Sequence, residues 1–414
     1  MKKISLVLII LLFVQSFYVF AQDKSSGKKV SGIPDRLFEM GFGNINVNFA
    51  NNFLTLSDAY EDVIVIDLDN LANGFKFNFG LTATPFYFNI KSKKGAGFGI
   101  STNVDAMGII NLSGNMLTLN EANNESSDVS GAVFSSAAVN TFFNLGRIKV
   151  KFSPSMFYTL AYVTPPKDMP SSVVYNLDYS DGTVGYINYA ARLYLPFSLE
   201  KEVYNYDSFN AKPGFDFTVG LEYPVAKAIG LAKILPFLDF DLGVDLINIP
   251  FLPSTLSDYV LISGRAGSDK PIKIINKDDD DDYGDLYTLD EIVYGKDELK
   301  INRPFKVVAH ADWRPLFGMK LLTLTPVFGF CHNELYTDPF SLEAGINACL
   351  NLGNFLLFKA GVNYTDRMYV NSVGFTLNIR LIQFDVGADV RSHDFNQSFK
   401  GAGLGVNFGL KLGW

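Results

Sequence analysis

Charged side chains recur at intervals of two along several short stretches of this chain. Asp239, Asp241 and Asp245 share one parity in the stretch 236–248, and the residues of the other parity are apolar. Burying three carboxylates of one strand in a dry core is costly, so this face is expected to meet water. In a water-filled passage, such a row attracts ions and orients dipolar solutes.

The same arrangement appears in three other stretches, 148–158, 215–223 and 305–314. From these rows we predict the side chains that line an aqueous lumen: Asp216, Glu222, Asp239, Asp241, Asp245, Lys149, Lys151, Lys306, His310, Asp312 and Arg314. We expect the carboxylates to form an acidic wall and the lysines and Arg314 to form an opposing basic wall. Opposing walls would create a transverse field, and the net acidity predicts a preference for cations.

Other chemically suggestive patterns are weaker. The acidic run from Asp278 to Asp282 invites a calcium site, but with Gly284 at the sixth loop position Asp290 falls where a bidentate glutamate is needed. A solvated loop tip and loose calcium binding both remain open for this run. His310 and Asp312 form a weak dyad or a polar pair on one strand face, and no nucleophile is spaced to use them. We therefore predict no enzyme activity, no metal site and no cofactor.

The elements that must position these rows are β-strands, because a side-chain period of two is typical of strands. No run of 18 mostly apolar residues follows Phe20, which argues against membrane-spanning helices. We predict an all-β, antiparallel, up-and-down transmembrane β-barrel of about sixteen strands, with fourteen to eighteen possible. The predicted strands are 40–49, 74–89, 97–108, 130–143, 147–159, 172–179, 183–197, 213–223, 236–247, 303–314, 320–331, 341–352, 355–365, 373–380, 382–391 and 403–414.

The predicted connections alternate between short and long, as in bacterial outer-membrane barrels. The short ones are 144–147, 180–182, 315–319, 353–354 and the turn near Leu381, and we place all of them on the periplasmic side. The largest long one, 248–302, is predicted to be an extracellular loop that can fold inward as a constriction. The segment 224–235 is long for a periplasmic turn and is predicted to contain a short helix.

The N-terminus and the overall charge add two expectations. Residues 1–21 have the charged, apolar and small-residue regions of a secretory signal peptide, so we expect export. Residues 22–39 would then be a periplasmic segment or plug, and residues 40–414 the barrel.

The formal net charge of −8 excludes a basic footprint for nucleic acid. Cys331 and Cys349 fall about eight residues apart in the predicted pairing, so we expect two free thiols.

The last strand resembles the C-terminal assembly signal of outer-membrane barrel proteins. Phe408, Leu410, Leu412 and Trp414 alternate with small or polar residues, and the chain stops on the aromatic ring. This resemblance implies an outer-membrane location and recognition by the barrel-assembly machinery.

The residue pattern of the whole chain resembles that of poorly characterised barrels of spirochaetes and Bacteroidetes and, more distantly, that of FadL-type transporters of hydrophobic compounds. The stretches that carry it are NNFLTLSDAY (51–60), DFDLGVDLINIPFLP (239–253) and VGFTLNIRLIQFDVGADV (373–390). The Asn-Pro-Ala plug motif of FadL-type proteins is absent after residue 22.

We predict an outer-membrane channel or transporter that passes small solutes. Two alternatives stay open: FadL-like uptake of hydrophobic compounds, and a surface adhesin or structural barrel that uses its long outer loops. The expected partners are membrane lipid, the assembly machinery, a small solute or hydrophobic ligand, and a host or surface partner for the loops.

Overall fold

The structure is a computed structural model, and it describes residues 36–52, 74–112, 128–166, 172–178, 182–200, 203–230, 234–268, 287–316 and 321–413. The predicted signal peptide, most of the segment 22–39, the acidic run at 278–282 and Trp414 lie outside these residues.

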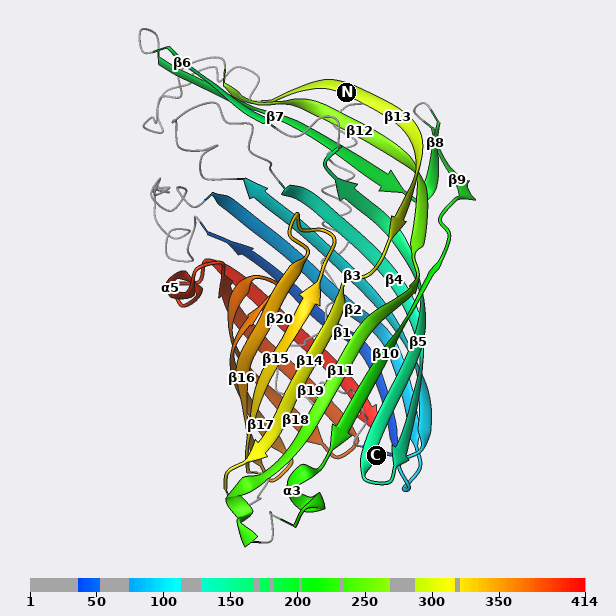
Figure 1. The fold of residues 1–414 in the computed structure, drawn as a ribbon, viewed down its shortest axis with the longest axis vertical. Coiled ribbons are helices and arrows are strands. Elements are labelled where there is room, and N and C mark those ends of the chain that lie inside the picture. The colour runs from blue at the N-terminus through cyan, green and yellow to red at the C-terminus, as the bar shows by residue number, and fades with distance from the viewer. Residues whose placement is uncertain are drawn as a thin grey trace.

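Fourteen antiparallel strands close into a barrel (Figure 1). In order around the wall they are β1 (Phe38–Asn51), β2 (Phe75–Lys91), β3 (Gly97–Leu112), β4 (Asp128–Leu145), β5 (Ile148–Thr164), β10 (Gly214–Tyr223), β11 (Asp239–Leu252), β14 (Phe305–Arg314), β15 (Leu322–His332), β16 (Phe340–Leu352), β17 (Leu356–Thr365), β18 (Met368–Ile379), β19 (Ile382–Ser392) and β20 (Gly403–Gly413). The last strand pairs with the first, for example Leu412 with Met40, so the wall leaves no free edge.

The six remaining strands lie outside this ring. They are β6 (Ser172–Asp178), β7 (Gly182–Leu195), β8 (Phe197–Glu200), β9 (Val203–Phe209), β12 (Ser254–Ser268) and β13 (Tyr287–Ile301). β6, β7, β12 and β13 pair in that order and rise as a sheet above one end of the barrel (Figure 1).

This sheet corrects two predictions. The stretches 172–179 and 183–197 are not wall strands, so the wall has fourteen strands, the lower end of the predicted range of fourteen to eighteen, and the hairpin of β6 and β7 belongs to the end with the long connections. The described part of the predicted loop 248–302 is likewise the end of β11 and the paired strands β12 and β13.

The connections differ between the two ends, which we name the loop end and the turn end. The turn end carries the short links 92–96, 146–147 and 380–381, as well as α3 (Val225–Ala228) and the 3₁₀ turn Pro236–Leu238. The predicted turn near Leu381 is confirmed, with Arg380 at a φ of 51°, and α3 confirms the short helix expected in 224–235. The loop end carries the sheet of β6, β7, β12 and β13 and the segment 393–402 with α5 (Phe395–Ser398). In the described ranges no helix is long and apolar enough to cross a membrane.

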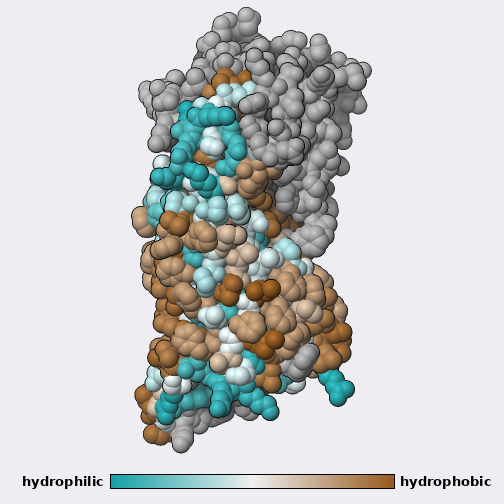
Figure 2. Space-filling view, turned by 90° about the vertical axis from the view of Figure 1, so that its right-hand side faces the viewer, coloured by the Kyte–Doolittle hydropathy of each residue, from teal (hydrophilic) through white to brown (hydrophobic). Residues whose placement is uncertain are grey.

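The two faces of the wall differ as the period of two requires. On β11, Leu242 and Val244 expose 44% and 38% of their surface, whereas Asp241 and Asp245 expose 7% and 1%. Apolar residues gather in a band around the middle of the wall, with hydrophilic residues above and below it (Figure 2). An outward apolar band with polar residues inside is the arrangement of a transmembrane β-barrel.

The strand register also fixes the separation between the two cysteines. Cys331 lies opposite Ser341, and Cys349 lies opposite Thr323, so the cysteines are eight residues apart along β16. Neither cysteine forms a disulfide, as predicted.

Candidate functional site: the barrel interior

The predicted lumen residues occupy the inner face of four neighbouring strands, β5, β10, β11 and β14. Eight of the eleven are buried, namely Asp216, Glu222, Asp239, Asp241, Asp245, His310, Asp312 and Arg314. Lys149, Lys151 and Lys306 are half-buried. The predicted residues therefore lie on the buried face of each of these strands.

The predicted acidic and basic walls, however, do not oppose one another. Lys149 Nζ donates to Glu222 Oε1 across the β5–β10 pair. Arg314 donates to Asp239 and Asp241 across the β11–β14 pair. Charges of opposite sign thus lie side by side on one wall, because antiparallel pairing places them there, and the wall does not divide into separate acidic and basic faces.

Of the two interpretations left open for His310 and Asp312, the structure does not show the dyad. The carboxylate of Asp312 accepts a hydrogen bond from Thr325 Oγ1 at 2.9 Å. The imidazole instead turns toward β11, where its Nδ1 lies 3.9 Å from Asp245 Oδ2. Gly243 makes room for it, since a Cβ at that position would lie 2.1 Å from His310 Cε1.

Lys306 lies nearer the loop end than the other predicted cations. Its Nζ donates to Glu343 Oε1 at 2.7 Å and to Asp366 Oδ1 at 3.0 Å. Neither carboxylate was predicted, although Glu343 lies on the inward parity of β16. Cys331 completes a group of three possible metal ligands with them, but the Lys306 ammonium already satisfies both carboxylates.

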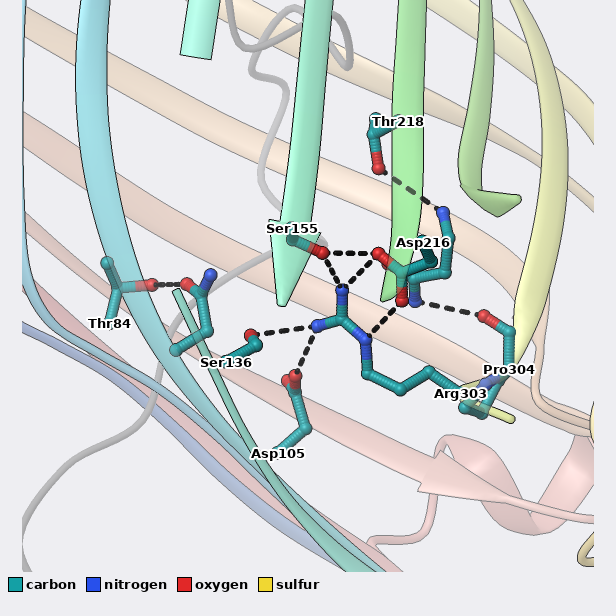
Figure 3. Close-up of polar contacts among 10 residues, drawn as sticks. Thr84, Asp105, Ser136, Ser155, Asp216, Thr218, Arg303 and Pro304 are labelled. Carbon is teal, nitrogen blue, oxygen red and sulfur yellow. Dashed lines mark hydrogen bonds and ion pairs between the residues drawn. The ribbon is translucent and has the colours of Figure 1, made fainter. Parts of the chain in front are cut away.

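Arg303 is the most highly bonded residue of the interior, and the sequence analysis did not single it out. It lies between β13 and β14, and its guanidinium forms a two-pronged ion pair with Asp216, with both N–O distances at 2.7 Å (Figure 3). Nη1 also donates to Ser136 and Nη2 to Ser155, at 2.8 and 2.6 Å. The guanidinium carbon lies 5.1 Å from the centre of the Phe157 ring. Arg303 therefore ties the segment between β13 and β14 to β4, β5 and β10.

A second set of charges lies on the other side of the barrel. Lys359 on β17 donates to Asp385 on β19 at 3.1 Å, and Arg391 donates to Asp389 at 2.6 Å. These residues share the inward parity of their strands, so the alternation that identified the first set was present here as well.

On the side of β3, β4 and β5, the interior is apolar toward the loop end. The residues of this region, which we call the mouth cluster, are Ile109, Ala132, Phe134, Phe157, Tyr162, Tyr194, Leu256, Ile301 and Leu335. They come from the wall strands β3, β4 and β5, from β7, β12 and β13 of the raised sheet, and from the link between β15 and β16. Each exposes less than a tenth of its surface. The mouth cluster therefore lies between the polar interior and the loop end.

The link between β15 and β16, residues 333–339, crosses the barrel. Ser130 Oγ on β4 donates to the carbonyl of Leu335 at 2.6 Å, and Asn333 Nδ2 lies 3.7 Å from Met107 Sδ on β3. Counted around the wall, β16 and β3 are seven strands apart in either direction, so this crossing loop contacts the opposite part of the wall.

The β17–β18 turn holds the crossing loop in place. Arg367 donates to the carbonyls of Asp338 and Phe340, and its guanidinium carbon lies 4.6 Å from the centre of the Tyr336 ring. Tyr336 in turn donates to the carbonyl of Asp366. Asp366 and Arg367 both have positive φ values, 49° and 64°, as a tight hairpin turn requires.

His393, in the link between β19 and β20, connects this turn to the wall. Its Nδ1 donates to the carbonyl of Arg367 at 3.2 Å, and its Nε2 lies 3.1 Å from Asn78 Oδ1 on β2. Burial, together with the positive charges of Lys76 and Arg367, lowers the pKa of His393 to about 4. The imidazole is therefore neutral at pH 7.

The described part of 248–302 does not form the predicted constriction, and residues 269–286 lie outside the described residues. The crossing loop and the Asp366–Arg367 turn cover the barrel at the loop end, while the described part of 248–302 extends upward and contributes Leu256 and Ile301 to the mouth cluster. The sequence holds no periodic signal for the crossing loop, because its seven residues bond mainly to distant strands.

Comparisons with known proteins find only distant similarity to solved structures. No known protein family and no curated protein matches the sequence. The toluene transporter TodX of Pseudomonas putida has a TM-score of 0.46 at 9% identity, covering 96% of each chain. The toluene transporter TbuX of Ralstonia pickettii has a TM-score of 0.43 at 9% identity, covering 91% of this chain and 89% of the other. The translocator domain of the autotransporter NalP of Neisseria meningitidis has a TM-score of 0.33 at 8% identity, with 92% and 89% covered.

Proposed function

We propose that the chain is an outer-membrane transporter that admits small, predominantly apolar solutes through its loop end. The observation that carries the proposal is the mouth cluster, which places aromatic and aliphatic side chains between the loop end and the polar interior. A water-filled porin is polar inside. An apolar solute gains roughly 25 cal/mol for each Å² of apolar surface that it buries against such side chains, whereas an ion loses its hydration there.

The crossing loop adds a gate to this path. It spans the barrel and bonds to the far wall through Ser130, so a solute passes only when the loop moves. It makes one hydrogen bond to β2 and one to β4, each worth about 1 kcal/mol, and several contacts with the Asp366–Arg367 turn, including an exposed ion pair between Arg367 and Asp338 at 3.1 Å. Opening therefore breaks a few weak contacts and leaves the strand pairing of the wall intact.

The ends of the crossing loop make a clean test possible. The backbone N–H of Asn333 donates to the carbonyl of Pro339 at 2.8 Å, so the two ends of the loop lie side by side. Residues 334–338 can therefore be replaced by Asn-Gly without moving β15 or β16. In planar bilayers we expect little potassium conductance from the wild type and an open conductance from the shortened variant. In cells that carry the protein in their outer membrane, we expect faster accumulation of a radiolabelled uncharged aromatic such as naphthalene than in cells without it.

A matched control shortens the β12–β13 hairpin instead, by joining the paired residues Leu261 and Val293 through a two-residue turn. This change leaves the crossing loop in place and should not open the barrel to potassium. A wild-type protein with steady potassium conductance and no effect on aromatic accumulation would contradict the proposal and favour an open, polar pore.

The raised sheet supports a second candidate function, adhesion. Its strands β6, β7, β12 and β13 extend beyond the barrel at the loop end. If the sheet binds a host or matrix surface, the variant with the shortened β12–β13 hairpin should lose cell attachment and keep aromatic uptake. Unchanged attachment in that variant would exclude a role for this hairpin.

A further inference from the structure

A hollow of about 530 Å³ lies on the outward face of the wall, across β15 to β20. Its floor is a row of lateral neighbours in which Ala348 lies opposite Ala360, Ala360 opposite Val373, and Val373 opposite Ala388. Three of these four side chains are methyl groups. The hollow exists because this row is small, and its volume falls in the range of small-molecule sites, about 300–1,000 Å³.

Larger rings border the hollow on two sides. Toward the turn end, Phe358 lies opposite Phe375, and Val386 separates Phe375 from Phe408 in the same row; all three rings are exposed. Toward the loop end runs an aromatic ladder of Tyr364, Tyr369, Phe395 and Phe399, whose successive ring centres are 4.9, 5.3 and 5.2 Å apart. The hollow is therefore a groove between two aromatic ridges.

The groove descends from the loop end toward the turn end. Leu404, at one extremity, is the second residue of β20 and lies at the loop end of that strand. Leu324, at the other, is the third residue of β15 and lies near the turn end. The groove thus runs diagonally down the part of the wall that faces hydrocarbon.

Polar groups gather only at the loop end of the groove. Asn371, which has the outward parity of β18, donates from Nδ2 to Ser398 Oγ at 2.9 Å and so fixes α5 against the wall. Its Oδ1 accepts no hydrogen bond from the described part of the chain. Phe399, which lines the groove, is followed by the exposed Lys400. A hydrogen-bond acceptor, Asn371 Oδ1, and a cation, Lys400, thus lie where the groove meets the membrane surface.

We propose that this groove binds one acyl chain of a membrane lipid whose headgroup carries an anionic phosphate. The chain lies along Ala348, Ala360 and Ala388, between the aromatic ridges, and Lys400 meets the phosphate. A lipid chain fits better than a second copy of the protein because a barrel presents a convex wall, which cannot fill a recess between two ridges. The inference uses only the outward face, so it does not depend on what the barrel transports.

The test uses the full chain in liposomes that contain phosphatidylglycerol with a photoactivatable diazirine on its acyl chain. After illumination and digestion, we expect adducts to concentrate on peptides of β16 to β19 rather than on the outward faces of β3 and β4. The variant Ala360→Phe with Ala388→Phe fills the groove, and labelling there should fall about tenfold, the loss expected when roughly two methylene groups lose their contacts. Ala137→Phe, an exposed outward alanine on β4, is the matched control and should leave the labelling unchanged.

Lys400→Glu supplies an independent readout that does not disturb the groove. It should reduce labelling by phosphatidylglycerol and leave labelling by the zwitterionic phosphatidylcholine probe unchanged. Even labelling around the whole wall, labelling that persists in the filled variant, or crosslinks between two copies through β16–β19 would each overturn the proposal.

Discussion

Replacing Arg303 by alanine should destabilise the barrel more than any other single change to an interior charge. The guanidinium is 8% exposed, and Asp216, to which it binds through two nitrogens, is 4% exposed. Removing one partner of a buried ion pair leaves the other charge uncompensated, at a cost of about 3–5 kcal/mol. Ser136 loses its bond to the guanidinium as well, so we expect a loss near the upper end of this range.

The measurement is the free energy of unfolding from guanidinium titrations of the protein in lipid vesicles. Arg303→Lys keeps the charge but lacks the two-pronged geometry, so it should lose less than the alanine variant. Lys93→Ala, at an exposed position in the β2–β3 turn, is the control and should stay within about 0.5 kcal/mol of the wild type.

A double-mutant cycle separates the ion pair from the rest of the network. Arg303→Met with Asp216→Asn removes both charges, so its loss should be smaller than the sum of the two single losses by about 1–3 kcal/mol. Additive losses, or an alanine variant less than about 1 kcal/mol below the wild type, would refute the view that this pair is dry and mutually compensating.

Three further outcomes are expected. His393 has a pKa of about 4 in the folded protein and about 6.5 when unfolded, so the unfolded state binds more protons between these values. The closed mouth should therefore be fully stable above about pH 6.5 and weaken as the pH falls toward 4, which faster hydrogen exchange in 333–339 would show. The variant His393→Asn should flatten that pH dependence. Arg380→Gly should raise the free energy of unfolding by up to about 1 kcal/mol in the same titrations, because Arg380 has a φ of 51° that glycine adopts without strain; an unchanged value would show that its side chain compensates. Oxidation with copper phenanthroline should leave Cys331 and Cys349 unbridged by mass spectrometry, since they lie eight residues apart in register; a bridge would contradict the pairing of β15 and β16.

The sequence predicts the wall well because alternation is a local property. Within each wall strand, apolar outward residues alternate with polar inward residues, as Leu242 and Val244 do with Asp241 and Asp245. The same alternation wrongly assigns the stretches 172–179 and 183–197 to the wall, because a hairpin in the raised sheet also alternates. Closure of the barrel depends on β10 pairing with β5, across more than fifty residues, and that choice leaves no periodic trace.

The interior is predictable only in part, for a related reason. Parity identifies the inward side chains but says nothing of which strand lies beside which. Arg314 was therefore expected to face the carboxylates across the lumen, whereas pairing places it next to Asp239 and Asp241. Arg303 lies at the edge of the predicted strand 303–314, before its alternating run 305–314, so its role follows only from the strands that surround it.

These pairings change what can select a solute. On the wall of β5, β10, β11 and β14, Glu222 is paired with Lys149, Asp216 with Arg303, and Asp239 and Asp241 share Arg314. A carboxylate that is already neutralised attracts a passing cation weakly, so these pairs stabilise the wall more than they sort ions. Selection then falls to the mouth cluster and the crossing loop, where a solute must leave water before it reaches any charge. The order of the two regions matters, because an apolar surface at the entrance rejects ions before the polar interior can hold them. Hydrophobic solutes should therefore be favoured even though most of the inner wall is polar.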